Sequence, residues 1–131
     1  MTSIVTQARV EGQHRYEGAP PAVQFLAFPH RHEFHIRVEI EVFHTNRDIE
    51  IIMLKHLILQ HFEAEYPKLN HASRIYNFET LSCETLAENL MFYLKGYYKD
   101  DDEADELGRS RLMSVQVLED GENGAIIRES I

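Results

Sequence analysis

Two long stretches of alternating apolar and polar residues constrain the fold of this chain more than any other feature. The first covers roughly residues 3–16 and the second roughly residues 30–45. In the second stretch every other residue is apolar: Phe34, Ile36, Val38, Ile40 and Val42. Because successive side chains of a strand point to opposite faces of a sheet, this alternation predicts two long β-strands, each with one buried face.

Three histidines lie where these two strands would meet. His30 and His32 share the parity of the apolar residues that follow them, and His14 shares the parity of Ala8 and Val10. We therefore expect three imidazoles to converge at one end of a hairpin. Three neutral imidazoles are the ligand set of an open zinc site, whose fourth position is left for water or substrate. From the residues alone, hydrogen-bonded core histidines without a metal stay an alternative.

Length and composition predict one domain over residues 1–131. The chain is 44% hydrophobic, which is enough for one hydrophobic core, and it is too short for two domains that each have a core of their own. No apolar run is long enough to span a membrane, and the first residues lack the pattern of a signal peptide, so we expect a cytoplasmic protein. The single cysteine, Cys83, excludes an intramolecular disulfide and fits either a reducing compartment or a catalytic thiol.

The acidic net charge of −9 argues against nucleic acid as a partner, because binding to phosphate needs a basic face. Much of the excess lies in residues 100–106, where six of seven residues are Asp or Glu. Like charges repel one another and favour an extended, hydrated chain. We therefore predict a solvated loop there.

The rest of the chain predicts two helices between two pairs of strands. The first helix is expected from apolar residues at helical spacing before Pro67, and the second from a Ser82 cap and an apolar stripe that ends before Gly96. Strands through Met113–Val117 and Ala125–Ile127 flank a turn at residues 120–124. The predicted order is β-β-α-α-β-β, an α+β fold with helices on one face of an antiparallel sheet.

With its elements in this order, the chain resembles the family of 6-pyruvoyl tetrahydropterin synthase and 6-carboxytetrahydropterin synthase over nearly its whole length. Residues 12–16 resemble the family's first histidine motif, and residues 30–34 resemble its His-Gly-His-Asn-Tyr. Leu-Asn-His at residues 69–71 is similar to the family's Leu-Asp-His, and residues 82–90 to its Pro-Thr-x-Glu-x-Leu-Ala. Residues 115–126 resemble the closing hairpin. The shared order and spacing of these motifs carry the resemblance.

This resemblance implies the tunnelling fold, in which small subunits join their sheets into a ring and two rings stack. It implies a homohexamer, a dimer of trimers, with each active site between chains. It further implies three zinc ligands, a histidine that transfers protons, a glutamate that grips the pterin ring, and a pocket bordered by the start of the second helix. The corresponding residues are His14, His30 and His32 for zinc, His71 for proton transfer, and Glu119, Ser82 and Glu84 for the substrate.

The implied activity is that of a zinc-dependent lyase or synthase acting on a dihydropterin such as 7,8-dihydroneopterin triphosphate, in pterin or deazapurine (queuosine) biosynthesis. The pattern departs from the family in two places. Leu26 lies near the position of the family's catalytic cysteine, and Asn70 replaces the aspartate that would orient the histidine. Cys83 is a candidate replacement base, because a helix N-terminus lowers the pKa of a thiol; the alternative is a small buried helix residue.

Three functional interpretations are compatible with these residues. The first is an enzyme with altered proton-transfer groups. The second is an oligomer that binds a pterin or purine without turnover or with a different specificity, and the third is an oligomer whose metal is structural. A ring-recognising Glu119 favours the first two, because a scaffold has no use for such a residue.

Overall fold

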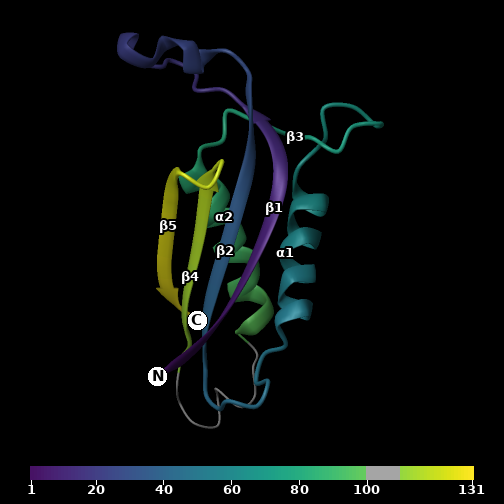
Figure 1. Cartoon of the computed structure of the whole chain (residues 1–131), viewed down its shortest axis with the longest axis vertical. Helices are drawn as coiled ribbons and strands as arrows, with labels where there is room; N and C mark the ends of the chain where they lie inside the picture. Colours follow the sequence, from purple (N-terminus) through teal and green to yellow (C-terminus); the bar gives the residue numbers. More distant parts are fainter. Residues whose placement is uncertain (100–109) are drawn as a thin grey trace.

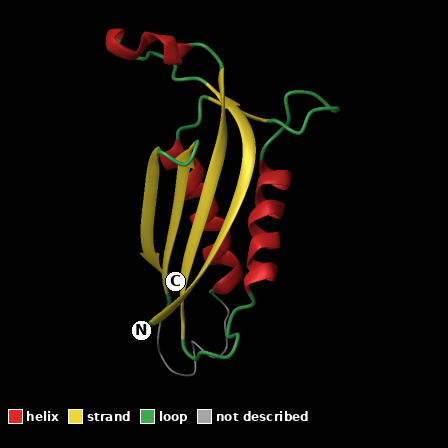
Figure 2. Cartoon of the chain, viewed as in Figure 1, coloured by secondary structure: helices red, strands yellow, loops and turns green. Residues whose placement is uncertain are grey.

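The structure of the chain is a computed structural model, which describes residues 1–99 and 110–131. The described residues form a five-stranded sheet with two α-helices on one face (Figure 1 and Figure 2). The elements in chain order are β1 (Thr2–His14), the 3-10 helix η1 (Pro21–Ala27), β2 (His30–Val42), α1 (Ile51–Glu65), β3 (Tyr76–Glu79), α2 (Cys83–Tyr98), β4 (Leu112–Glu119) and β5 (Asn123–Ser130). The predicted acidic loop at residues 100–106 lies outside the described residues.

The two predicted long strands are confirmed as an antiparallel hairpin. β1 and β2 pair along their whole lengths, and His14 lies directly opposite His30 at one end. The apolar residues of β2 form the centre of the core: Phe34, Ile36, Val38 and Ile40 have no exposed surface. The opposite face of the same strands carries charged and polar side chains, as the alternation predicted.

The predicted order and the purely antiparallel sheet are wrong at one place. A short strand, β3, follows α1 and precedes α2 in the chain, and it pairs in parallel with Gly12–His14 of β1. The strand order in the sheet is therefore β3-β1-β2-β4-β5. β3 has only four residues, so its sequence is too short to show the alternation that revealed the longer strands.

The remaining boundaries differ by a few residues from the predicted ones. α1 ends one residue before Tyr66, ahead of Pro67 as expected, whereas α2 continues past Gly96 to Tyr98. A single glycine costs a helix only about 1 kcal/mol, and the buried face of α2 offsets that cost. The connection between β1 and β2, expected to be a loop, contains η1, which begins at a proline as helix starts often do.

Two local features hold the ends of the elements near the histidines. The Ser82 hydroxyl accepts a hydrogen bond of 3.2 Å from the N–H of Thr85, which confirms the predicted cap of α2. At Gly12 a Cβ would lie 2.2 Å from the ring of Phe78 and 2.9 Å from that of Phe34, so β1 can approach these rings only with glycine at this position.

No helix among the described residues has the length and apolar character needed to cross a membrane.

Candidate metal centre and adjoining pocket

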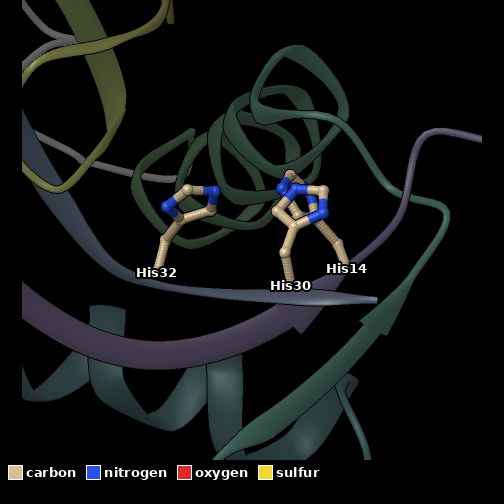
Figure 3. Close-up of side chains that lie close together, drawn as sticks. All are labelled: His14, His30 and His32. Carbon is tan, nitrogen blue, oxygen red and sulfur yellow. The ribbon is translucent and has the colours of Figure 1, made fainter. Parts of the chain in front are cut away.

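The three predicted histidines converge at the end of the β1–β2 hairpin. His14 comes from β1, and His30 and His32 come from β2 on the same face (Figure 3). One ring nitrogen from each residue lies within 4.8 Å of the others. His14 is buried, and the other two side chains are half-buried. The parity argument from the sequence is therefore confirmed in its geometry.

Each of these rings has its Nδ1 atom engaged in a hydrogen bond. The Nδ1–H of His14 donates to the Leu81 carbonyl at 2.8 Å, and that of His30 donates to the Phe28 carbonyl at 2.9 Å. The Nδ1–H of His32 donates to Oδ2 of Asp120 at 2.7 Å. Carbonyl and carboxylate oxygens only accept hydrogen bonds, so Nδ1 carries the hydrogen and each neutral ring is left with a free lone pair on Nε2.

These free Nε2 atoms make the group fit a zinc ion. Nε2 of His14 and Nε2 of His32 are both buried and have no hydrogen-bond partner among the described residues. A buried acceptor without a partner costs free energy, and a bound cation removes that cost. Imidazole nitrogens are common zinc ligands, and their other nitrogen usually donates to a carbonyl or a carboxylate, as all three do here.

The protonation of His14 agrees with this role. Burial lowers the pKa of His14 below its ordinary value, although the hydrogen bond to Leu81 and the charge of Glu119 act in the raising direction. The neutral imidazole is the form that binds a metal. Near neutral pH His14 is therefore already in its ligating form.

Glu119, at the end of β4, lies against two of the three rings. Its Oε1 is 3.0 Å from Nε2 of His14, and its Oε2 is 3.3 Å from Nε2 of His32. Neither contact has the geometry of a hydrogen bond, since both Nε2 atoms lack a hydrogen-bond partner among the described residues. The side chain of Glu119 is 28% exposed and also reaches the pocket described below.

Asp120, which the sequence analysis did not single out, belongs to the same group. Besides accepting from His32, its carboxylate accepts a hydrogen bond of 3.0 Å from the N–H of Glu33, and its own N–H donates to the Glu33 carbonyl at 2.8 Å. The hydrogen bond from His32 is the main cause that lowers the pKa of Asp120. Its position directly after Glu119 in the β4–β5 turn was the available sequence signal.

A cavity of about 410 Å³ adjoins the histidines at the start of α2. The structure brings together there most of the predicted site residues: His14, His30, Ser82, Cys83, Glu84 and Glu119. Leu26, near the position where the resemblance places a catalytic cysteine, also lines the cavity. The wall at that place is therefore apolar.

Two predicted site residues, His32 and His71, do not line the cavity, and His71 is also no member of the histidine group. It is exposed, in the turn between α1 and β3, where the Ser73 N–H donates to the Asn70 carbonyl at 3.1 Å. In Figure 1 this connection projects from the body of the sheet.

The expectation of a lowered pKa for Cys83 is wrong. The thiol is buried at the start of α2, and its Sγ lies 3.7 Å from Oε1 of Glu119. Burial, followed by the charge of Glu119, raises the pKa of Cys83 to about 12. Desolvation and a nearby carboxylate thus act against the lowering expected at a helix N-terminus. The role of Cys83 as a base stays a prediction.

No protein-family model matches the sequence, and no curated protein matches it by sequence. By structure, the chain is similar to 6-pyruvoyl tetrahydropterin synthase from Plasmodium falciparum, with a TM-score of 0.66 and 11% identity over 99% of this chain and 98% of that one. It is also similar to a catalytic-residue mutant of 6-pyruvoyltetrahydropterin synthase from Plasmodium vivax, with a TM-score of 0.63 and 12% identity over 99% and 98% of the two chains. The chain therefore has the tunnelling fold of these synthases, an α+β fold with helices on one face of the sheet.

Proposed function

We propose that this chain is a zinc-dependent lyase of the 6-pyruvoyl tetrahydropterin synthase type, acting on a dihydropterin such as 7,8-dihydroneopterin triphosphate. The observation that carries the proposal is the histidine group, in which every Nδ1 is hydrogen-bonded and the Nε2 lone pairs are free, beside a cavity of about 410 Å³. The likeness in fold to two pterin synthases supports the substrate class.

The residues of the cavity take separate roles in this proposal. His14, His30 and His32 would hold zinc, which acts as a Lewis acid toward oxygens of the substrate side chain. Glu119 would accept hydrogen bonds from the amino and imino groups of the ring, a paired contact that rejects rings without those donors. Ser82 and Glu84 line the same cavity and would border the bound ring.

A homo-oligomer would supply what one chain lacks. β3 pairs only with the last three residues of β1, so the rest of that edge of β1 has no strand partner among the described residues. β5 forms the other edge of the sheet. Open edges favour pairing with another chain. We propose a cytoplasmic homohexamer, a dimer of trimers, in which His71 of a second copy reaches the cavity and transfers protons.

A second candidate function is binding of a pterin or purine without turnover. It is favoured by the cavity wall itself, where Leu26 offers no proton acceptor. The raised pKa of about 12 also keeps the thiol of Cys83 protonated at neutral pH. Under this candidate, a ring would bind beside the metal and leave unchanged.

Product analysis separates the two candidates. Zinc-loaded protein would be incubated with 7,8-dihydroneopterin triphosphate, with and without acetaldehyde, and the products identified by mass spectrometry. We expect a product with the wild-type chain and its loss in His71→Ala, whereas His56→Ala, which removes another exposed histidine, should keep it.

The other possible outcomes of this experiment each contradict one part of the proposal. Substrate that binds but leaves unchanged supports the binding protein and contradicts the lyase. Turnover that is unaffected in His71→Ala removes His71 from the mechanism. A zinc-loaded wild-type chain that neither binds nor converts the dihydropterin contradicts the proposed substrate class.

A further inference from the structure

Glu119 lies between the histidines and the cavity, and it contacts both. We propose that Glu119 is a displaceable fourth ligand to the metal held by His14, His30 and His32, so that the site is closed until a substrate draws the carboxylate away. The inference rests on the metal-binding part of the proposed function. It adds a second role to the one that the sequence resemblance implies for this glutamate.

The first argument is the spacing of the donor atoms. Two atoms that bind one tetrahedral zinc ion at about 2.0 to 2.1 Å lie roughly 3.3 Å apart. The two oxygens of Glu119 lie 3.0 Å from Nε2 of His14 and 3.3 Å from Nε2 of His32. The carboxylate is thus at the separation expected of a ligand that shares a metal with these rings.

The second argument is the chemistry of the facing atoms. With Nδ1 carrying the hydrogen, Nε2 of each ring presents a lone pair, and both oxygens of Glu119 present lone pairs toward two of these atoms. Acceptors that face one another at this distance repel unless a cation lies between them. A metal ion bound by both the rings and the carboxylate would satisfy this arrangement, since the Nε2 atoms of His14 and His32 have no hydrogen-bond partner among the described residues.

The third argument concerns what can move. The backbone at Glu119 is held by its pairing with Phe34 in the sheet, and the next residue, Asp120, is bound to Glu33 by two hydrogen bonds. The side chain of Glu119 is partly exposed and opens toward the cavity. The carboxylate can therefore leave the histidines by rotation about its own side-chain bonds while the strand stays in place.

This placement couples ring recognition to opening of the metal site. Zinc with four protein ligands is closed, whereas catalytic zinc keeps one position open. A ring with adjacent N–H donors would attract the carboxylate of Glu119 and vacate that position. A molecule with the hydroxylated side chain but without the ring would lack the N–H donors that draw Glu119 away from the metal. Glu119 would therefore select the substrate in two ways, by binding the ring and by opening the metal site only when the ring is bound.

Cobalt spectroscopy tests the inference without any turnover. Cobalt(II) would be bound by the wild-type chain and by Glu119→Ala and Glu119→Gln, and each sample titrated with azide. We expect the visible spectrum of the wild type to change little, because its fourth position is filled. Both variants should show a clear azide-dependent change, and their zinc affinity, measured against a chromophoric chelator, should fall at least about tenfold.

Glu122→Ala is the matched control, since it removes the same charge from the same turn at an exposed position. It should behave like the wild type. A wild-type spectrum that responds to azide as strongly as the variants, or a zinc affinity unchanged in both Glu119 variants, overturns the inference. A wild-type chain that binds no cobalt overturns it together with the proposed function. A closed cobalt site in a protein that binds no dihydropterin keeps the inference and contradicts only the proposed substrate.

Discussion

Asp120 and His32 are joined by a hydrogen bond of 2.7 Å from Nδ1 of the ring to Oδ2 of the carboxylate. His32 is thus the one member of the histidine group whose Nδ1–H donates to a charged group, because those of His14 and His30 donate to backbone carbonyls. The turn that carries Asp120 also carries Glu119, so a single segment contacts His32 at both nitrogens. Residues at the β4–β5 turn therefore contact the His32 ring on both sides.

Asp120→Asn should weaken zinc binding by about 10- to 100-fold, because the amide keeps a partner for Nδ1 but removes the charge that raises ligand basicity. Competition with a chromophoric chelator measures this affinity. Glu122→Gln, which replaces a carboxylate of the same turn with an uncharged amide, should bind zinc like the wild type. Zinc affinity equal to that of the wild type in both Asp120→Asn and Asp120→Ala would show that Asp120 has no part in the metal site.

His30→Ala should abolish zinc retention and leave the fold intact, because the ring contributes one of the three nitrogens and lies at the partly exposed end of its strand. Zinc content by mass spectrometry and the far-ultraviolet circular dichroism spectrum check both expectations. His35→Ala is the control, since His35 lies on the opposite face of β2, 2.9 Å from Glu33. Full zinc occupancy in His30→Ala would refute the assignment.

Asp48→Asn should lower the free energy of unfolding by about 3 to 5 kcal/mol, the usual cost of removing one partner of a buried ion pair. Asp48 is 4% exposed and its Oδ2 accepts from Arg111 at 2.9 Å and from the N–H of Phe43 at 2.8 Å. Burial acts to raise the pKa of Asp48, but these hydrogen bonds outweigh it and the pKa is lowered.

Urea denaturation at neutral pH, with a chelator present, measures the loss in Asp48→Asn. A double variant, Asp48→Leu with Arg111→Met, removes both charges and should lose less than the sum of the two single variants. A single variant within about 0.5 kcal/mol of the wild type would mean that the pair does not secure the start of β4.

His61 should make the fold less stable as the pH falls. Burial lowers its pKa, the nearby charge of Glu65 only partly opposes this, and its Nε2 has no hydrogen-bond partner among the described residues. The ring packs against Tyr66 and Tyr93, at centroid distances of 5.7 and 5.1 Å. Its folded pKa lies below the unfolded value of about 6.5, so its contribution is complete above about pH 6.5 and is lost as the pH falls through the interval between the two.

The expected loss has a slope of at most about 1.4 kcal/mol per pH unit. Unfolding free energies of the wild type and of His61→Leu, measured from about pH 7 to about pH 5 with a chelator present, isolate this contribution. The variant should show a shallower decline. Parallel curves for the two proteins would mean that His61 titrates alike in the folded and unfolded chains.

The sequence predicted the hairpin and its histidines because both depend on a simple period. A period of two residues puts His14, His30 and His32 on one face of the sheet, and antiparallel pairing brings the ends of the strands together. The cap at Ser82 was equally local. β3 was missed because four residues carry no readable period. η1 was missed because the prolines at its start, Pro20 and Pro21, indicated a break in the strand without specifying the turn that follows.

The contacts of Glu119 could not be read from the sequence. Its distance from His14 depends on how β4 lies beside β2 and on where the β4–β5 turn begins, and both are tertiary features. The same contacts explain the wrong expectation for Cys83, since the carboxylate that raises its pKa is 36 residues away in the chain. His71 was predicted by resemblance alone, and nothing within one chain brings it to the cavity.

The segment between residues 14 and 30 leaves the sheet and returns to it at directly opposed residues, His14 and His30. A metal bound by both would act as a cross-link at the base of this excursion, with the entropic effect that a disulfide has on the loop it closes. Since the cost of closing a loop grows slowly with its length, the excursion could be lengthened, shortened or replaced with little effect on the strands. It is therefore a part of the chain where new substrate contacts could arise, provided that the Phe28 carbonyl that accepts from His30 stays in place.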